Sequence, residues 1–141
     1  MEWAVAVRRR NNPRMPKTHD RFAETFAALR AILEAHAKPM TVTVDEPGHY
    51  QLASPTMTDR VGRPLFCASV QINKNYVSYH LMPVYSNKAL RESLSASLKK
   101  RMQGKSCFNF TTVEPEQLKE LTVVTKKGIA GFKNLKLPWV S

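Results

Sequence analysis

The fold of this chain is decided by residues 66–81, which read FCASVQINKNYVSYHL. Apolar and polar residues alternate on both sides of the turn-favouring Asn-Lys-Asn triplet at 73–75, so the stretch predicts an antiparallel hairpin. When Val70 lies opposite Tyr79 and Ser69 opposite His80, both strands place their apolar residues on one face. The apolar set is Phe66, Ala68, Val70, Ile72, Val77, Tyr79 and Leu81, and the polar set is Cys67, Ser69, Gln71, Tyr76, Ser78 and His80. We therefore expect a sheet with one face in the core and the other open to solvent or ligand.

The sequence on either side of this hairpin predicts further strands and three helices. Strands are expected at 40–45, 49–53 and 105–110, where apolar and polar residues alternate, with a loop at 54–63. The first helix begins at Thr18 and has an apolar stripe of Phe22, Phe26, Leu29 and Leu33. The second is capped by Ser86 or Asn87, ends at Gly104 and has a stripe of Leu90, Leu94, Leu98 and Met102. The third extends from Pro115 to Gly128. This order of elements predicts an α+β fold, an antiparallel sheet of about four to five strands with helices packed on one face.

The length and charge of the chain limit the classes of function. Its 141 residues suit a single domain at 18–141, preceded by a basic segment at 1–17 that is predicted to be a poorly ordered arm. The 22 basic and 11 acidic residues give a net charge of +11, which attracts anionic ligands and polyanions but can also serve solubility alone. The chain has only two cysteines, Cys67 and Cys107, and its start is unlike a signal peptide, so we expect a cytoplasmic protein. Because it has no run of ~18 apolar residues, we expect no membrane partner.

The polar face of the predicted sheet is the candidate ligand surface. Positive charge comes from a basic rim, which we define as Lys99, Lys100, Arg101 and Lys105. Hydrogen bonds would come from Ser69, Gln71, Ser78, His80 and Asn109. Together these groups favour a non-enzymatic binding module for an anionic small molecule or macromolecular partner. Contact with a nucleic-acid backbone fits the charge, but base stacking is poorly served because Tyr76 is the only aromatic residue predicted on this face.

Two other chemistries are open to residues of the same face. Cys67, His80 and Cys107 are all predicted to point outward, and thiolate and imidazole ligands suit zinc or copper. The same three residues would support a thiol-dependent enzyme if His80 lowered the pKa of a cysteine. Neither a Cys-x-x-Cys pair nor a fourth ligand accompanies them, so no cofactor is predicted and packing is the simplest role of the cysteines.

A resemblance to a known family is carried by residues 62–83, GRPLFCASVQINKNYVSYHLMP, and residues 98–110, LKKRMQGKSCFNF. The pattern resembles the YdhG-like domain family, small proteins mostly of unknown function that include frataxin-like intracellular iron chaperones. It extends over residues 62–127 and, more loosely, over the first helix. The resemblance implies a fold of one sheet with helices and, as an alternative function, an iron carrier. Frataxin-type iron binding uses clustered carboxylates, whereas the only local acidic cluster here, Glu114, Glu116 and Glu120, lies among lysines.

Overall fold

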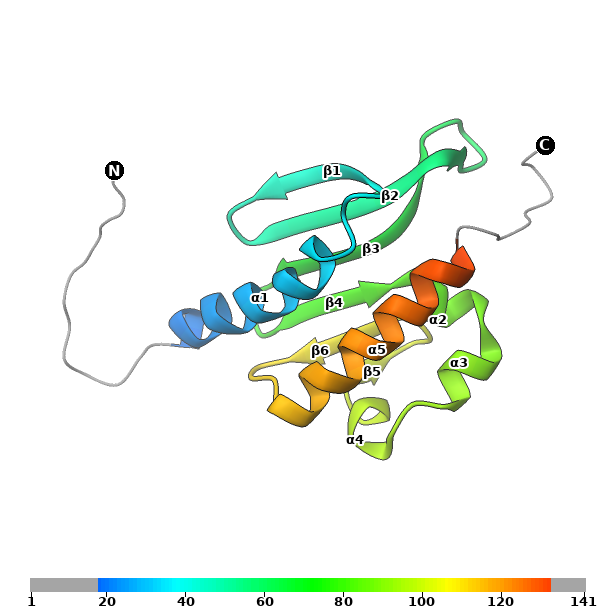
Figure 1. The fold of residues 1–141 in the computed structure, drawn as a ribbon. Coiled ribbons are helices and arrows are strands. Elements are labelled where there is room, and N and C mark those ends of the chain that lie inside the picture. The colour runs from blue at the N-terminus through cyan, green and yellow to red at the C-terminus, as the bar shows by residue number, and fades with distance from the viewer. Residues whose placement is uncertain (1–17, 133–141) are drawn as a thin grey trace.

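The computed structural model describes residues 18–132 and contains one six-stranded antiparallel sheet in the order β1-β2-β3-β4-β6-β5 (Figure 1). The helices are α1 Thr18–Glu34, α2 Met82–Ser86, α3 Lys88–Glu92, α4 Ala96–Lys99 and α5 Pro115–Phe132. The strands are β1 Thr41–Glu46, β2 His49–Thr58, β3 Pro64–Ile72, β4 Val77–Leu81, β5 Met102–Gln103 and β6 Cys107–Phe110. The predicted α+β fold is confirmed, with six strands instead of four to five. The predicted arm at 1–17 lies outside the described residues, as does the chain after Phe132.

The helices α1 and α5 lie across one face of the sheet, and α2 and α3 pack against α5 (Figure 1). The predicted stripe of α1 is buried, with Leu29 and Leu33 fully enclosed. Beneath the helices lie large side chains of the central strands, among them Val70, Tyr79 and Phe108, each with no exposed surface. The opposite face of the sheet, called the outer face below, carries no helix of the described chain. None of the described helices is long and apolar enough to cross a lipid bilayer.

The central hairpin has the predicted register. Val70 pairs with Tyr79 and Ser69 with His80, and the ladder runs from Ala68 to Ile72 of β3 without interruption. Because strand side chains alternate, this register places the apolar residues of both strands under the helices and Ser69, Gln71, Ser78 and His80 on the outer face.

A β-bulge at Cys67 reverses the two faces at the start of β3. Leu52 pairs with Ala68, but the next residue of β2, Ala53, pairs with Phe66, so β3 contains one extra residue at this point. Cys67 consequently turns into the core, where it has no exposed surface, while the Phe66 ring contacts His80 edge-on at 4.9 Å between centroids. The prediction that Phe66 faces the core and Cys67 faces outward is therefore wrong, because alternation was extended across a bulge.

The predicted second helix is also wrong as a continuous element. Asn87 and Ser95 have extended backbones, and in place of one helix the segment forms the two short helices α3 and α4. Each begins a new short helix by accepting a backbone N–H, Asn87 from Leu90 and Ser95 from Leu98. The apolar residues that suggested a helix, Leu90, Leu94 and Leu98, are nevertheless buried as expected. The sequence pattern predicted burial correctly and the backbone path incorrectly.

Two further boundaries differ from the predictions. The strand β2 continues through Thr58, where a loop was expected, because the Ser54 hydroxyl accepts the backbone N–H of Met57 at 2.8 Å and steadies an irregular stretch of the strand. The helix α5 passes through Gly128 and ends at Phe132. A Cβ atom at Gly128 would lie 2.8 Å from the Cβ of Pro83, so the glycine permits α2 to approach α5 closely.

Candidate functional site

Two rows of polar side chains cross the outer face of the sheet. In each row, neighbouring residues are directly opposed in the strand register, so their Cβ atoms lie only about 5 Å apart. The first row consists of His49, Gln71, Ser78 and Asn109, and the second row of Gln51, Ser69, His80, Cys107 and Gln103. The register therefore brings together all five residues that were predicted to supply hydrogen bonds, Ser69, Gln71, Ser78, His80 and Asn109.

A chain of hydrogen bonds fixes the first row. The Asn73 side-chain amide donates to Ser78 Oγ at 2.7 Å, and this hydroxyl donates to Asn109 Oδ1 at 3.0 Å. The Asn109 amide in turn donates to Gln103 Oε1 at 2.6 Å. Gln71, next to Ser78, is exposed and its amide forms no hydrogen bond with the described residues. The row thus combines side chains held in place with one amide that is available to a ligand.

His80 lies at the centre of the second row and is half-buried. Its Nε2 atom is 2.7 Å from the hydroxyl oxygen of Ser106, and burial lowers its pKa below the usual value of 6.5. The imidazole is therefore neutral at neutral pH and can donate or accept a hydrogen bond. Ser69, directly opposite His80, is only 9% exposed and offers little surface to a ligand.

Ser106 lies in the site although it was not among the predicted site residues. It follows the turn at Gly104, whose φ of 79° favours glycine, and its carbonyl accepts the backbone N–H of Leu81 at 2.8 Å. This bond holds Ser106 beside the end of β4, next to His80. Gly104 was predicted to end a helix and residues 105–110 to form a strand, but only the pairing of β4 with β6 shows which side chain the serine meets.

The structure separates the cysteines. Burial raises the pKa of Cys67 to about 12 in the core, whereas Cys107 lies on the outer face opposite His80, and burial raises its pKa as well. An activated thiol has a lowered pKa, so neither cysteine shows the property that a thiol nucleophile needs. Of the predicted metal set only His80 and Cys107 share a face, and among residues 18–132 no group of three or more His, Cys, Asp or Glu is placed to hold a metal. Iron or zinc binding stays an alternative that the sequence leaves open.

The acidic residues of α5 serve local contacts. Glu120 accepts hydrogen bonds from the backbone N–H of Ser95, at 2.8 Å, and from its hydroxyl, at 2.5 Å. Glu116 lies 4.0 Å from Lys119. Glu120 is thus occupied in joining α5 to the start of α4, as expected for a structural carboxylate.

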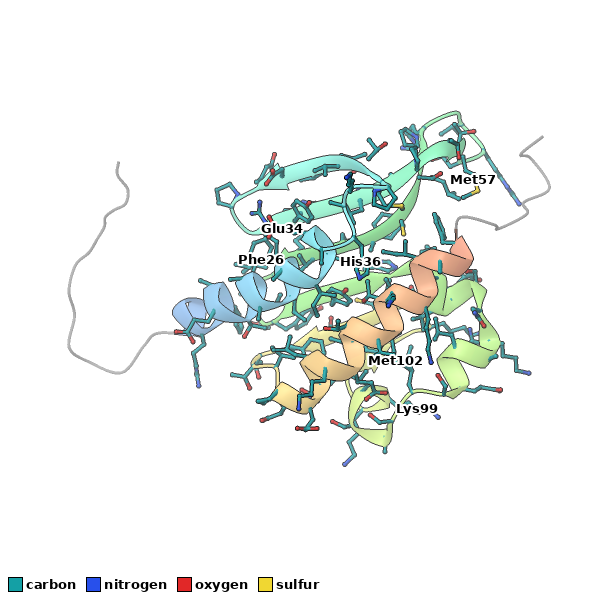
Figure 2. All side chains as sticks on the ribbon, viewed as in Figure 1. Phe26, Glu34, His36, Met57, Lys99 and Met102 are labelled. Atoms are coloured by element: carbon teal, nitrogen blue, oxygen red, sulfur yellow. The ribbon has the colours of Figure 1, made fainter. Side chains whose placement is uncertain are left out.

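The basic rim lies beside β5 and β6. All four of its side chains are exposed, and the segment between Glu92 and Glu114 contains these four basic residues and no acidic one. None of them forms an ion pair with a described residue. The carbonyl of Arg101 accepts the backbone N–H of Asn109 at 2.8 Å, which places Arg101 next to the first row, and Lys105 immediately precedes Ser106. Lys99 is the last residue of α4 and lies at the periphery of the molecule (Figure 2).

The chain matches no known protein family, no curated protein and no solved structure in the three comparisons that were made. The resemblance to the YdhG-like family accordingly stays a prediction. The geometry of the outer face and of the basic rim is the basis for assigning a function.

Proposed function

We propose that the protein is a binding module for an anionic partner, a small molecule or a macromolecule, held on the outer face and the basic rim. The observation that carries the proposal is the juxtaposition of two continuous polar rows with four basic residues that lack acidic partners among the described residues. Arg101 and Lys105 lie closest to the rows and would make direct contacts, while Lys99 and Lys100 would contribute longer-range attraction.

The hydrogen-bonding groups suit this role because several are held in place before a ligand arrives. The chain through Ser78, Asn109 and Gln103 orients each amide, so less side-chain entropy is lost on binding. The free amide of Gln71 and the neutral imidazole of His80 would complete the set. Because the rim is exposed, its attraction should be screened at physiological salt, where the Debye length is about 8 Å.

A charge-reversal experiment tests the proposal. Lys100→Glu/Lys105→Glu should weaken binding to heparin, to single-stranded DNA or to phosphorylated metabolites at least about tenfold, since four units of charge change at the proposed site. Lys126→Glu/Lys127→Glu is the matched control, because both lysines are exposed on α5 and the change in net charge is the same. Fluorescence anisotropy or calorimetry at two salt concentrations supplies the affinities.

The affinities of the two double variants distinguish a site at the basic rim from a general effect of net charge. Equal losses of affinity would mean that only net charge matters and that the rim is not a site. Binding that neither variant alters would remove the anionic-partner proposal altogether.

A further inference from the structure

A pocket of about 630 Å³ lies at the end of the outer face where β3 begins. Its volume is within the range of small-molecule sites, roughly 300–1,000 Å³. The apolar part of its wall consists of Pro64, Leu65, Phe66, Met82, Tyr85 and Phe132, contributed by β3, α2 and the end of α5. Phe66, which also contacts His80, and Gln51, a member of the second row, join the pocket to the outer face.

The pocket exists because of the β-bulge at Cys67. With regular alternation Phe66 would face the core; the bulge turns its ring outward, where it forms part of the wall. Tyr85 is 56% exposed, which is unusual for a large aromatic side chain beside an apolar hollow. An apolar ligand body would remove these surfaces from water and would be stabilised by that burial.

A charged group is fixed at the mouth of the same pocket. Asp59 Oδ1 accepts the backbone N–H of Val61 at 2.9 Å and of Arg63 at 3.0 Å, and its other oxygen accepts from Arg63 Nε at 3.0 Å. The guanidinium is therefore held by its Nε edge against Asp59, which also lines the pocket, and its two terminal nitrogens form no hydrogen bond or ion pair with the described residues. That terminal edge matches the two oxygens of a carboxylate.

We propose that the pocket binds a small amphipathic anion, a carboxylate whose apolar body lies against Leu65, Phe66 and Tyr85 and whose charged end pairs with the terminal edge of Arg63. This ligand class uses both the apolar wall and the Arg63 guanidinium, whereas a plain hydrocarbon would leave the guanidinium unused and inorganic phosphate would leave the apolar wall unused. The site is separate from the basic rim. It stands or falls independently of the proposed anion binding there.

The test compares decanoate with decan-1-ol, which has the same apolar body without the charge, by calorimetric titration of the full chain. Decanoate should bind saturably and about five- to tenfold more tightly than decan-1-ol, as expected for one exposed charge-assisted contact. Arg63→Gln should reduce decanoate affinity to that of decan-1-ol and leave the alcohol unaffected, whereas Lys126→Gln, an exposed charge removal on α5, should change neither.

A second variant locates the ligand. Ser86 is exposed and lines the pocket, so Ser86→Trp should fill the space without disturbing the core and should weaken both ligands at least about tenfold. Lys100→Glu/Lys105→Glu should leave decanoate binding unchanged, which separates this site from the basic rim.

Three results would overturn the proposal. They are equal decanoate affinity in the wild type and Arg63→Gln, unchanged binding in Ser86→Trp, and no binding of either ligand by the wild type.

Discussion

The contact between α5 and α2 gives a prediction that can be worked out from the structure. A methyl group introduced by Gly128→Ala would place its Cβ 2.8 Å from the Cβ of Pro83, well inside the ~3.5 Å at which carbon atoms pack favourably. Pro83 is a rigid ring on the backbone and cannot move aside like the end of a long side chain. Overpacking of this kind typically costs about 1–3 kcal/mol.

The helix propensity of alanine acts in the opposite direction. Replacing glycine inside a helix stabilises it by about 1 kcal/mol, so the net loss in the free energy of unfolding should be about 1–2 kcal/mol, with the clash towards the upper end of its range. Gly131→Ala is the control, because it lies on the same helix and a Cβ there meets nothing within 4 Å. That variant should equal or exceed the wild type, by up to about 1 kcal/mol.

Urea denaturation followed by circular dichroism measures both variants. The difference between their free energies of unfolding should equal the steric penalty. In a double-mutant cycle Pro83→Gly should relieve this penalty, with a coupling energy of at least about 1 kcal/mol. If Gly128→Ala is as stable as Gly131→Ala, the close approach of α2 to α5 is refuted.

Three other predictions concern the core, the outer face and the cysteines. Tyr79→Phe should lower the free energy of unfolding by about 1–3 kcal/mol in urea denaturation, because the buried Thr125 hydroxyl loses its hydrogen bond of 2.7 Å to the Tyr79 hydroxyl. A smaller loss of stability than for a Tyr→Phe change at an exposed position would contradict this. Burial lowers the pKa of His80, so the free energy of unfolding should fall as the pH drops from about 6.5 towards the folded-state pKa and should then level off. Urea titrations at several pH values should show that His80→Gln lacks this part of the pH dependence. Iodoacetamide should modify Cys107 before Cys67, and both more slowly than free cysteine, because burial raises both pKa values; rapid modification in mass spectrometry would instead support a thiol enzyme.

The candidate site was partly predictable, for a reason visible in its residues. Ser78, His80 and Asn109 were placed on one surface by alternation alone, because a strand turns every second side chain to the same side. Cys67 was misplaced by the same rule, because one extra residue in β3 reverses the faces and no residue type at 66–68 announces it.

The segment after β4 shows a similar division. The spacing of Leu90, Leu94 and Leu98 correctly predicted three buried side chains. Whether this segment is one helix or two short ones depends on the side chains of Asn87 and Ser95, which compete for backbone N–H groups and cap new helices.

By itself the sequence determined the α+β class, the register of the central hairpin and the apolar face of each long element, because these follow from the period of side-chain direction along one strand or helix. Only the tertiary structure decided the bulge that turns Phe66 outward, the meeting of His80 with Ser106, and the pocket beside Arg63. Each of these needs segments that are distant in the chain to pack at the same time, and a local pattern of residues contains no information on which distant partners meet.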